Sequence, residues 1–63
     1  MTKAEKISQS IKTQMAALGY YHKDMAEMMC MTRWMWRDRM NNPEHFRIDE
    51  LESVEEILHV KLF

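Results

Sequence analysis

The 63-residue chain predicts a single compact all-α domain, residues 1–63, built from four helices. Apolar residues recur at helical spacing along most of the chain. They make up 46% of the residues, with only one glycine and one proline, so a folded helical unit is favoured over a disordered chain. Residues that start and stop helices divide the chain into four segments. At this length a lone hydrophobic core is only marginally sufficient.

The first helix is expected over residues 3–18. Its core-facing residues are three or four positions apart: Ile7, Ile11, Met15 and Leu18. Thr2 followed by Glu5 is a capping-box pattern that marks the start of the helix. Gly19 follows where a left-handed residue is wanted, so it is expected to end the helix.

The second helix is expected over residues 22–29 and the third over residues 33–41. The inner face of the second helix is predicted to carry three residues: Met25, Ala26 and Met29. Thr32 is a favourable N-cap for the third helix, and Trp36 marks its buried face. The run Asn41-Asn42-Pro43 predicts its end.

The fourth helix is expected over residues 48–59. Its core-facing residues again follow helical spacing: Leu51, Val54, Ile57 and Leu58. Asp49 and Glu50 in the first turn suit the positive end of the helix dipole. Residues 60–63 form a short apolar tail, which is expected to be extended.

The second and third helices together predict a helix-turn-helix. Ala26 is small enough to let the third helix cross closely over the second, and Cys30 lies in the turn. The crossing places Arg33, Trp34 and Arg37 on the outward face of the third helix, where a DNA-binding protein carries its base contacts.

The net charge of −1 gives no overall basic signal for nucleic-acid binding, but the charges are unevenly distributed. Residues 22–47 contain Lys23 and all four arginines against four acidic side chains. Residues 49–56 contain five acidic side chains and no basic one. Such an acidic block is most often a solvated helix face, and the alternative is a docking surface.

From Ile11 to Val60 the sequence resembles the DNA-binding domain of the Cro/C1-type phage repressors, the XRE family. The resemblance is carried, in one register, by Gly19, Lys23-Asp24-Met25-Ala26-Glu27, Met31-Thr32-Arg33, Trp36 with Met40, Asn41-Asn42-Pro43, Ile48-Asp49-Glu50-Leu51, Leu58 and Val60. It implies a repressor-like fold in which the third helix enters the major groove by its N-terminal end. It also implies that backbone N–H groups at the start of the second helix hold a phosphate.

Three residues depart from the usual pattern of that family. His22 stands where members commonly have Gln, and it can still donate a hydrogen bond to phosphate. Cys30 stands where the turn glycine is usual, so a side chain is expected at a left-handed backbone angle. Trp34 replaces a small polar residue.

Arg33 and Arg37 lie one turn apart, so both can reach one groove, and Arg is suited to bidentate contact with guanine. The alternative is that they are solvated charges paired with Asp38. Asp38 itself repels phosphate unless it pairs with an arginine or accepts from cytosine. Trp34 has three interpretations: contact with a thymine methyl or sugar, a place in a protein interface, or cover for the core.

Four further residues are candidate DNA contacts. Two of them have a structural role first, and the other two are indicated by the resemblance. Thr32 is foremost a cap that also lies near phosphate, and Asn41 is foremost a helix-ending residue. His22 and Lys23 are candidates as phosphate contacts at the start of the second helix.

No enzyme, metal site or cofactor is expected. Six of the eight methionines fall between Met25 and Met40, and their spacing predicts core packing rather than thioether ligation. Cys30 lacks a legible base or oxyanion site for a nucleophile. The sequence contains no long apolar run and no signal-peptide pattern, and the one cysteine fits a reducing compartment, so a cytoplasmic protein without a membrane or small-molecule partner is expected.

The sequence therefore predicts a small phage or mobile-element transcriptional regulator that binds a pseudo-palindromic operator in double-stranded DNA. A homodimer is expected, with Val60, Leu62 and Phe63 as its contact, whereas a monomer would fold this tail over its own first helix. The alternatives are a protein-binding inhibitor or antirepressor with the same fold, and an assembly role through the acidic fourth helix.

Overall fold

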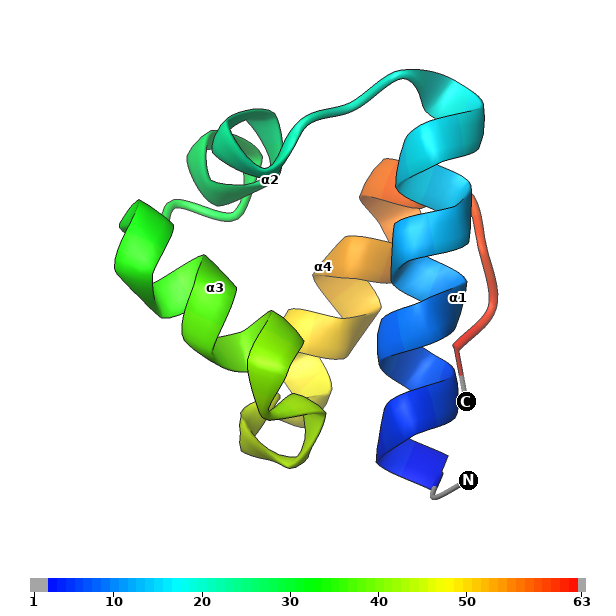
Figure 1. Ribbon diagram of the computed structural model, residues 1–63, viewed down its shortest axis with the longest axis vertical. Coiled ribbons are helices and arrows are strands. Elements are labelled where there is room, and N and C mark those ends of the chain that lie inside the picture. The colour runs from blue at the N-terminus through cyan, green and yellow to red at the C-terminus, as the bar shows by residue number, and fades with distance from the viewer. Residues whose placement is uncertain (1–2, 63) are drawn as a thin grey trace.

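The computed structural model describes residues 3–62 and has the expected all-α fold (Figure 1). Its elements are α1 (Lys3–Leu18), α2 (His22–Met28), α3 (Arg33–Asn41), the short 3-10 helix η1 (Pro43–His45) and α4 (Ile48–Leu58). No strand occurs within residues 3–62, and no helix there is both long and apolar enough to span a bilayer. The capping box predicted at Thr2 and the last tail residue, Phe63, lie outside the described residues.

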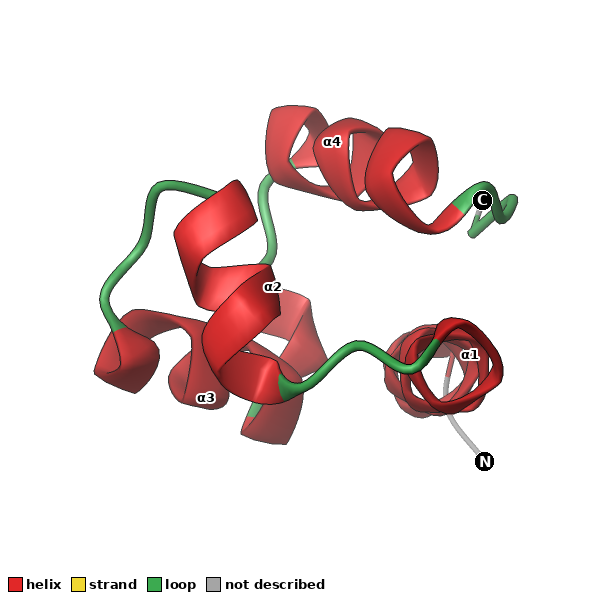
Figure 2. Cartoon of the chain, turned by 90° about the horizontal axis from the view of Figure 1, so that it is seen from above, coloured by secondary structure: helices red, strands yellow, loops and turns green. Residues whose placement is uncertain are grey.

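The four α-helices surround one core. In Figure 1, α2 and α3 lie on one side, α1 lies on the other, and α4 lies between them. The view in Figure 2, turned by a right angle, shows α1 end-on with α4 beside it and the α2–α3 pair opposite. The buried residues that meet between them come from every α-helix: Ile11, Met15, Met25, Ala26, Trp36, Met40, Val54 and Leu58. The indole of Trp36 is the largest fully buried side chain, and the ring of Phe46 packs edge-on against it with centroids 5.9 Å apart.

Two core predictions were wrong. The side chain of Leu18 is 41% exposed, because α1 ends at this residue and the chain then reverses at Gly19. Tyr20, after the reversal, packs against the core instead. Met28 is 42% exposed, so not every methionine of the cluster faces inward, although Met25 and Met40 do.

Helices α1, α2 and α4 end in the same way, because a residue that follows each helix has a left-handed backbone conformation. These residues are Gly19 (φ 75°), Cys30 (φ 57°) and His59 (φ 54°). In each case the next N–H group donates to a carbonyl five positions back: Tyr20 to Met15, Met31 to Ala26, and Val60 to Glu55. This is the Schellman arrangement, which satisfies carbonyls that the helix itself leaves unpaired. The left-handed angle predicted for Cys30 is confirmed. The predicted ends at 29 and 59 were each one residue too late.

The C-terminal tail is extended after His59, and its described part folds onto its own chain. Val60 and Leu62 are partly buried against the core, and the Leu62 N–H donates to the Glu55 carboxylate at 2.6 Å. The tail runs along α1 in Figure 1. Up to Leu62 the tail therefore covers its own first helix, which is the arrangement expected for the monomer.

Candidate nucleic-acid interface

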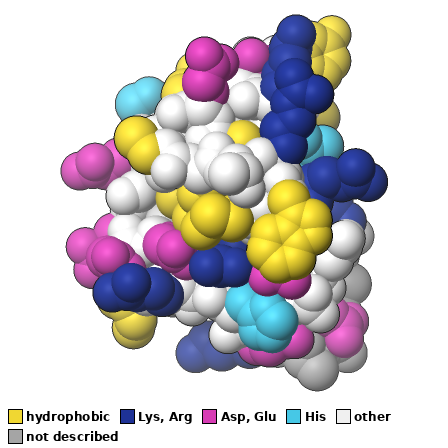
Figure 3. Space-filling view, turned by 90° about the vertical axis from the view of Figure 1, so that its left-hand side faces the viewer, with side chains coloured by type: hydrophobic (Ala, Val, Ile, Leu, Met, Phe, Trp, Pro, Cys, Tyr) yellow, Lys and Arg dark blue, Asp and Glu magenta, His cyan; other side chains and the backbone are white. Residues whose placement is uncertain are grey.

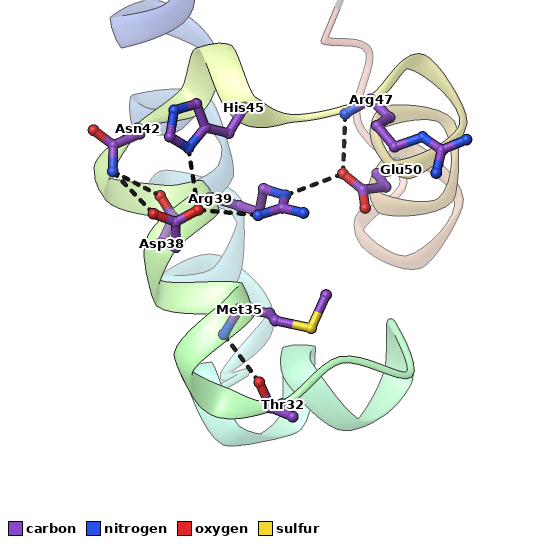
Figure 4. Close-up of polar contacts among 8 residues, drawn as sticks. All are labelled: Thr32, Met35, Asp38, Arg39, Asn42, His45, Arg47 and Glu50. Carbon is purple, nitrogen blue, oxygen red and sulfur yellow. Dashed lines mark hydrogen bonds and ion pairs between the residues drawn. The ribbon is translucent and has the colours of Figure 1, made fainter.

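Residues 29–32 form the turn that joins α2 to α3, and α3 has the predicted N-cap. The Met35 N–H donates to Oγ1 of Thr32 at 3.1 Å, as Figure 4 shows, so the side chain of Thr32 closes the first turn of α3. Ala26 is 2% exposed, and α2 packs against α3. A small buried residue at this position permits the close approach of the two helices.

An exposed stripe runs along α3. Arg33, Arg37 and Asn41 are spaced four residues apart, so they share one face of the helix, and all three are exposed. We call these three residues the α3 ridge. All three residues line two different surface hollows, so the α3 ridge lies between these hollows. The outward placement predicted for both arginines is confirmed.

The first depression, of about 400 Å³, lies between three helices. Its lining residues come from α1, α2 and α3: Lys12, His22, Lys23, Arg33, Arg37, Met40 and Asn41. We call it the basic hollow. Five of the eight residues predicted to contact DNA meet there, which places side chains from the start of α2 beside the arginines of α3.

The four cations of the basic hollow have no counter-ion among the residues that the structure describes. Neither the two lysines nor the two arginines of this hollow form an ion pair with any residue in 3–62, whereas Arg39 and Arg47 do. In Figure 3, which shows the face over α2 and α3, basic side chains lie along the upper right edge next to exposed hydrophobic ones, and others lie among acidic side chains elsewhere on this face. Clustered cations without partners produce a positive local potential that attracts an anion such as phosphate, even though the net charge of the chain is −1.

The second depression, of about 410 Å³, lies on the other flank of the ridge. It is lined by Trp34, Asp38 and Asn42 together with the ridge residues. Trp34 is 75% exposed. This exposure excludes the interpretation that Trp34 covers the core.

Asp38 does not pair with the ridge arginines. Its carboxylate is hydrogen-bonded to Arg39 Nη1 at 3.0 Å, to His45 Nδ1 at 3.1 Å and to Asn42 Nδ2 at 3.2 Å (Figure 4). These contacts, the hydrogen bond from His45 above all, hold the pKa of Asp38 below its usual value. The carboxylate is therefore occupied by neighbouring donors and does not pair with Arg33 or Arg37.

The same network joins α3 to the start of α4. The Arg39 guanidinium also donates to Oε1 of Glu50 at 3.3 Å, and this oxygen accepts the N–H of Arg47 at 2.9 Å (Figure 4). Glu50 thus closes the first turn of α4 while it is tied to α3. Arg39 belongs to the scaffold that orients α3, not to the exposed ridge.

Sequence reasoning missed two members of the site. Lys12 comes from α1 and completes the basic hollow, and the available signal was its helical position between buried Ser8 and Met15. Trp36 was predicted only as a core residue, yet its indole Nε1 donates to Nδ1 of His22 at 3.0 Å. No local pattern indicates a contact between residues so far apart in the chain.

No cluster of three or more potential metal-ligating His, Cys, Asp or Glu side chains occurs among residues 3–62. Cys30 is exposed at the turn between α2 and α3. Three of the methionines, Met15, Met25 and Met40, are buried in the core, where their flexible side chains fill space between the helices.

In comparisons with known proteins, no family model, no curated protein and no solved structure matches the chain. The resemblance to the Cro/C1-type repressors therefore depends on the residues named above.

Proposed function

We propose that the chain is a cytoplasmic, sequence-specific regulator of transcription of the Cro/C1 type that reads double-stranded DNA through α3. The observation that carries the proposal is the α3 ridge, whose two arginines are exposed between two hollows and form no ion pair within residues 3–62. A ridge of this kind fits the width of the major groove, and Arg pairs bidentately with guanine. The basic hollow beside it then receives the phosphate backbone.

We assign base contacts and backbone contacts to residues from their positions along α3 and around the basic hollow. Arg33 lies in the first turn and Arg37 one turn further, so both belong to the half of α3 that enters the groove first. Asn41 ends the ridge, and Lys23 and Lys12 line the basic hollow from α2 and α1, where we expect them to contact the DNA backbone. Trp34 adds an apolar surface for a thymine methyl or a sugar.

The test begins with selection of bound duplexes from a random pool at two salt concentrations. Arg37→Ala is expected to weaken binding to the selected site by about 1–3 kcal/mol and to relax its sequence preference at one position. Arg33→Ala is expected to do the same at a neighbouring position. Lys6→Ala is the matched control, because Lys6 is an exposed cation that lines a separate hollow on α1. Unchanged binding after removal of both arginines would exclude the proposed reading surface.

We further propose that the protein binds a pseudo-palindromic operator as a homodimer. A helix of nine residues offers few base contacts, so two copies on half-sites about 34–36 Å apart supply the missing affinity. The mass of the complex in solution, measured on duplexes with one and with two half-sites, tests this. Two chains are expected to bind the double site cooperatively, and more tightly than the single site binds the chain. One chain on the double site, or two chains that bind its half-sites independently, would refute the homodimer.

A protein-binding function is the second candidate, and the exposed apolar side chains favour it. Trp34, Tyr21 and Ile48 are each more than half exposed. An inhibitor or antirepressor would use such residues as anchors in a partner's pocket. The two candidates differ in salt dependence, since DNA affinity falls steeply as salt rises. A chain with no affinity for any duplex at low salt would favour the protein partner.

A further inference from the structure

The pairing of His22 with Trp36 has a chemical consequence for the basic hollow. Trp36 is fully buried, and its indole N–H can only donate. Its hydrogen-bond partner is Nδ1 of His22, at 3.0 Å, so that nitrogen must present its lone pair. A neutral imidazole with an accepting Nδ1 carries its proton on Nε2.

The second ring nitrogen of His22 is left for an external partner. His22 is exposed and lines the basic hollow together with Lys12, Lys23, Arg33 and Arg37, all of which can only donate. An Nε2–H group adds a neutral donor to this set of cations. The shared chemistry of the hollow is therefore the recognition of a multivalent oxyanion.

We propose that Trp36 is a positioning residue: its buried indole holds His22 in the Nε2–H tautomer, and His22 then donates from Nε2 to a backbone phosphate oxygen of bound DNA as an uncharged group. The inference rests on the proposed DNA-binding function for the identity of the oxyanion. The tautomer itself is a property of the free protein and is tested without DNA.

The alternative protonation states conflict with the buried indole. An Nδ1–H tautomer, or a ring protonated at both nitrogens, would set an N–H group against the indole N–H at hydrogen-bonding distance. The indole would then lose the partner that the structure gives it, and a buried donor without an acceptor is costly.

The first experiment is nitrogen-15 NMR of the histidine ring in the full chain at neutral pH, without DNA. We expect the Nδ1 resonance of His22 at the position of an unprotonated nitrogen and that of Nε2 at the position of a protonated one. Trp36→Phe removes the indole donor and is expected to abolish this preference. Trp34→Phe, at the exposed tryptophan, is the matched control and is expected to leave it intact. A proton on Nδ1 in the unaltered protein would overturn the proposal.

The second experiment uses a mixed-sequence duplex, because a phosphate contact is independent of sequence. His22→Asn places an amide oxygen near the position of Nδ1, so the indole keeps an acceptor while the outer donor is lost. We expect the affinity to fall about tenfold, which corresponds to one hydrogen bond to a charged group. The folded state should be retained, and the dispersion of the amide resonances checks this.

The salt dependence of the same variant identifies the charge on His22. Loss of a cation that neutralises a phosphate lowers the slope of log affinity against log salt by about 0.9. His22→Asn is expected to leave this slope unchanged, whereas Lys12→Ala is expected to reduce it. A reduced slope for His22→Asn, or an unchanged affinity, would refute the neutral donor. Absence of any duplex binding would refute the proposed function instead, while the tautomer result would stand.

Discussion

Among single residues, Cys30 in the turn between α2 and α3 has a strained backbone conformation. It occupies a left-handed conformation at φ 57°, which costs an L-residue about 1–2 kcal/mol and a glycine little. The turn keeps its form because Met31 and Cys30 donate to the carbonyls of Ala26 and Glu27. The path of the chain into α3 therefore depends on a strained residue that the surrounding hydrogen bonds hold in place.

Cys30→Gly is accordingly expected to stabilise the fold. Relief of the left-handed strain outweighs the extra chain entropy of glycine in the unfolded state, for a net gain of about 0.5–1 kcal/mol in the free energy of unfolding. Urea denaturation measures the change. His59→Gly should act in the same direction, because its φ is 54°. Gly19→Ala, at φ 75°, should act in the opposite direction although a Cβ there meets no neighbouring atom within 4 Å.

Asp38 makes stability depend on acid pH. Its pKa is lowered in the folded protein, mainly by the hydrogen bond from His45, so as the pH falls the unfolded chain takes up the proton first. The stabilisation is fully present above the ordinary aspartate value of about 3.9 and is lost as the pH falls through the lower folded value. Asp38→Asn and His45→Ala should each flatten this loss in pH-dependent unfolding curves. Curves that keep the slope of the unaltered protein would contradict the assignment.

At the scale of the element, α1 secures the ends of two other helices. Oγ of Ser8 donates to the carbonyl of Met40 near the end of α3, and Nε2 of Gln14 donates to the carbonyl of Leu58 at the end of α4. Carbonyls in the last turn of a helix have no partner within it, so these side chains replace water. Helix α1 therefore holds the end of α3, beside the basic hollow, and the end of α4.

Ser8→Ala is expected to lower the free energy of unfolding by about 1 kcal/mol, the usual loss when a buried hydrogen bond is removed. Ser8 is buried, whereas Ser10 on the same helix is exposed, so Ser10→Ala provides the matched control and should change stability little. Both variants are compared by urea denaturation. Equal effects would show that the contact to Met40 contributes nothing specific.

For the molecule as a whole, the proposed DNA binding depends on the local charge of the basic hollow and not on the net charge of the chain. The cations of the basic hollow come from three helices, while the acidic residues concentrate on α4. Because the Debye length at physiological salt is about 8 Å, a phosphate bound in the hollow responds mainly to the nearest charges. A chain with a net charge of −1 can therefore present a locally basic surface.

Lys12→Ala tests this charge separation. It is expected to weaken binding to every duplex and to lower the salt slope by about one unit, as the loss of one phosphate contact requires. Lys6→Ala removes the same charge from the same helix, but Lys6 lines a different hollow and should leave the slope unchanged. Fluorescence anisotropy at several salt concentrations measures both variants. Matching slopes for the two variants would mean that only net charge matters.

The positions of the helices and the exposure of the arginines of α3 can be predicted from the amino-acid sequence alone. Periodicity, the cap at Thr32 and the turn residues Gly19 and Cys30 act within a few positions, so they can be read along the chain. The same periodicity put Arg33 and Arg37 on one exposed face. It misjudged Leu18, because the stripe of α1 extends to the last turn, beyond the reach of the core.

The hydrogen-bond partners and neighbours of the candidate site residues, in contrast, can be identified only from the tertiary structure. The bond from Trp36 to His22 joins residues 14 positions apart, and that from Ser8 to Met40 joins residues 32 apart. Lys12 enters the basic hollow only because α1 and the α2–α3 pair pack around the same core. Such contacts depend on how the helices pack in three dimensions, and helical periodicity specifies the face of each helix but not the residue that faces it.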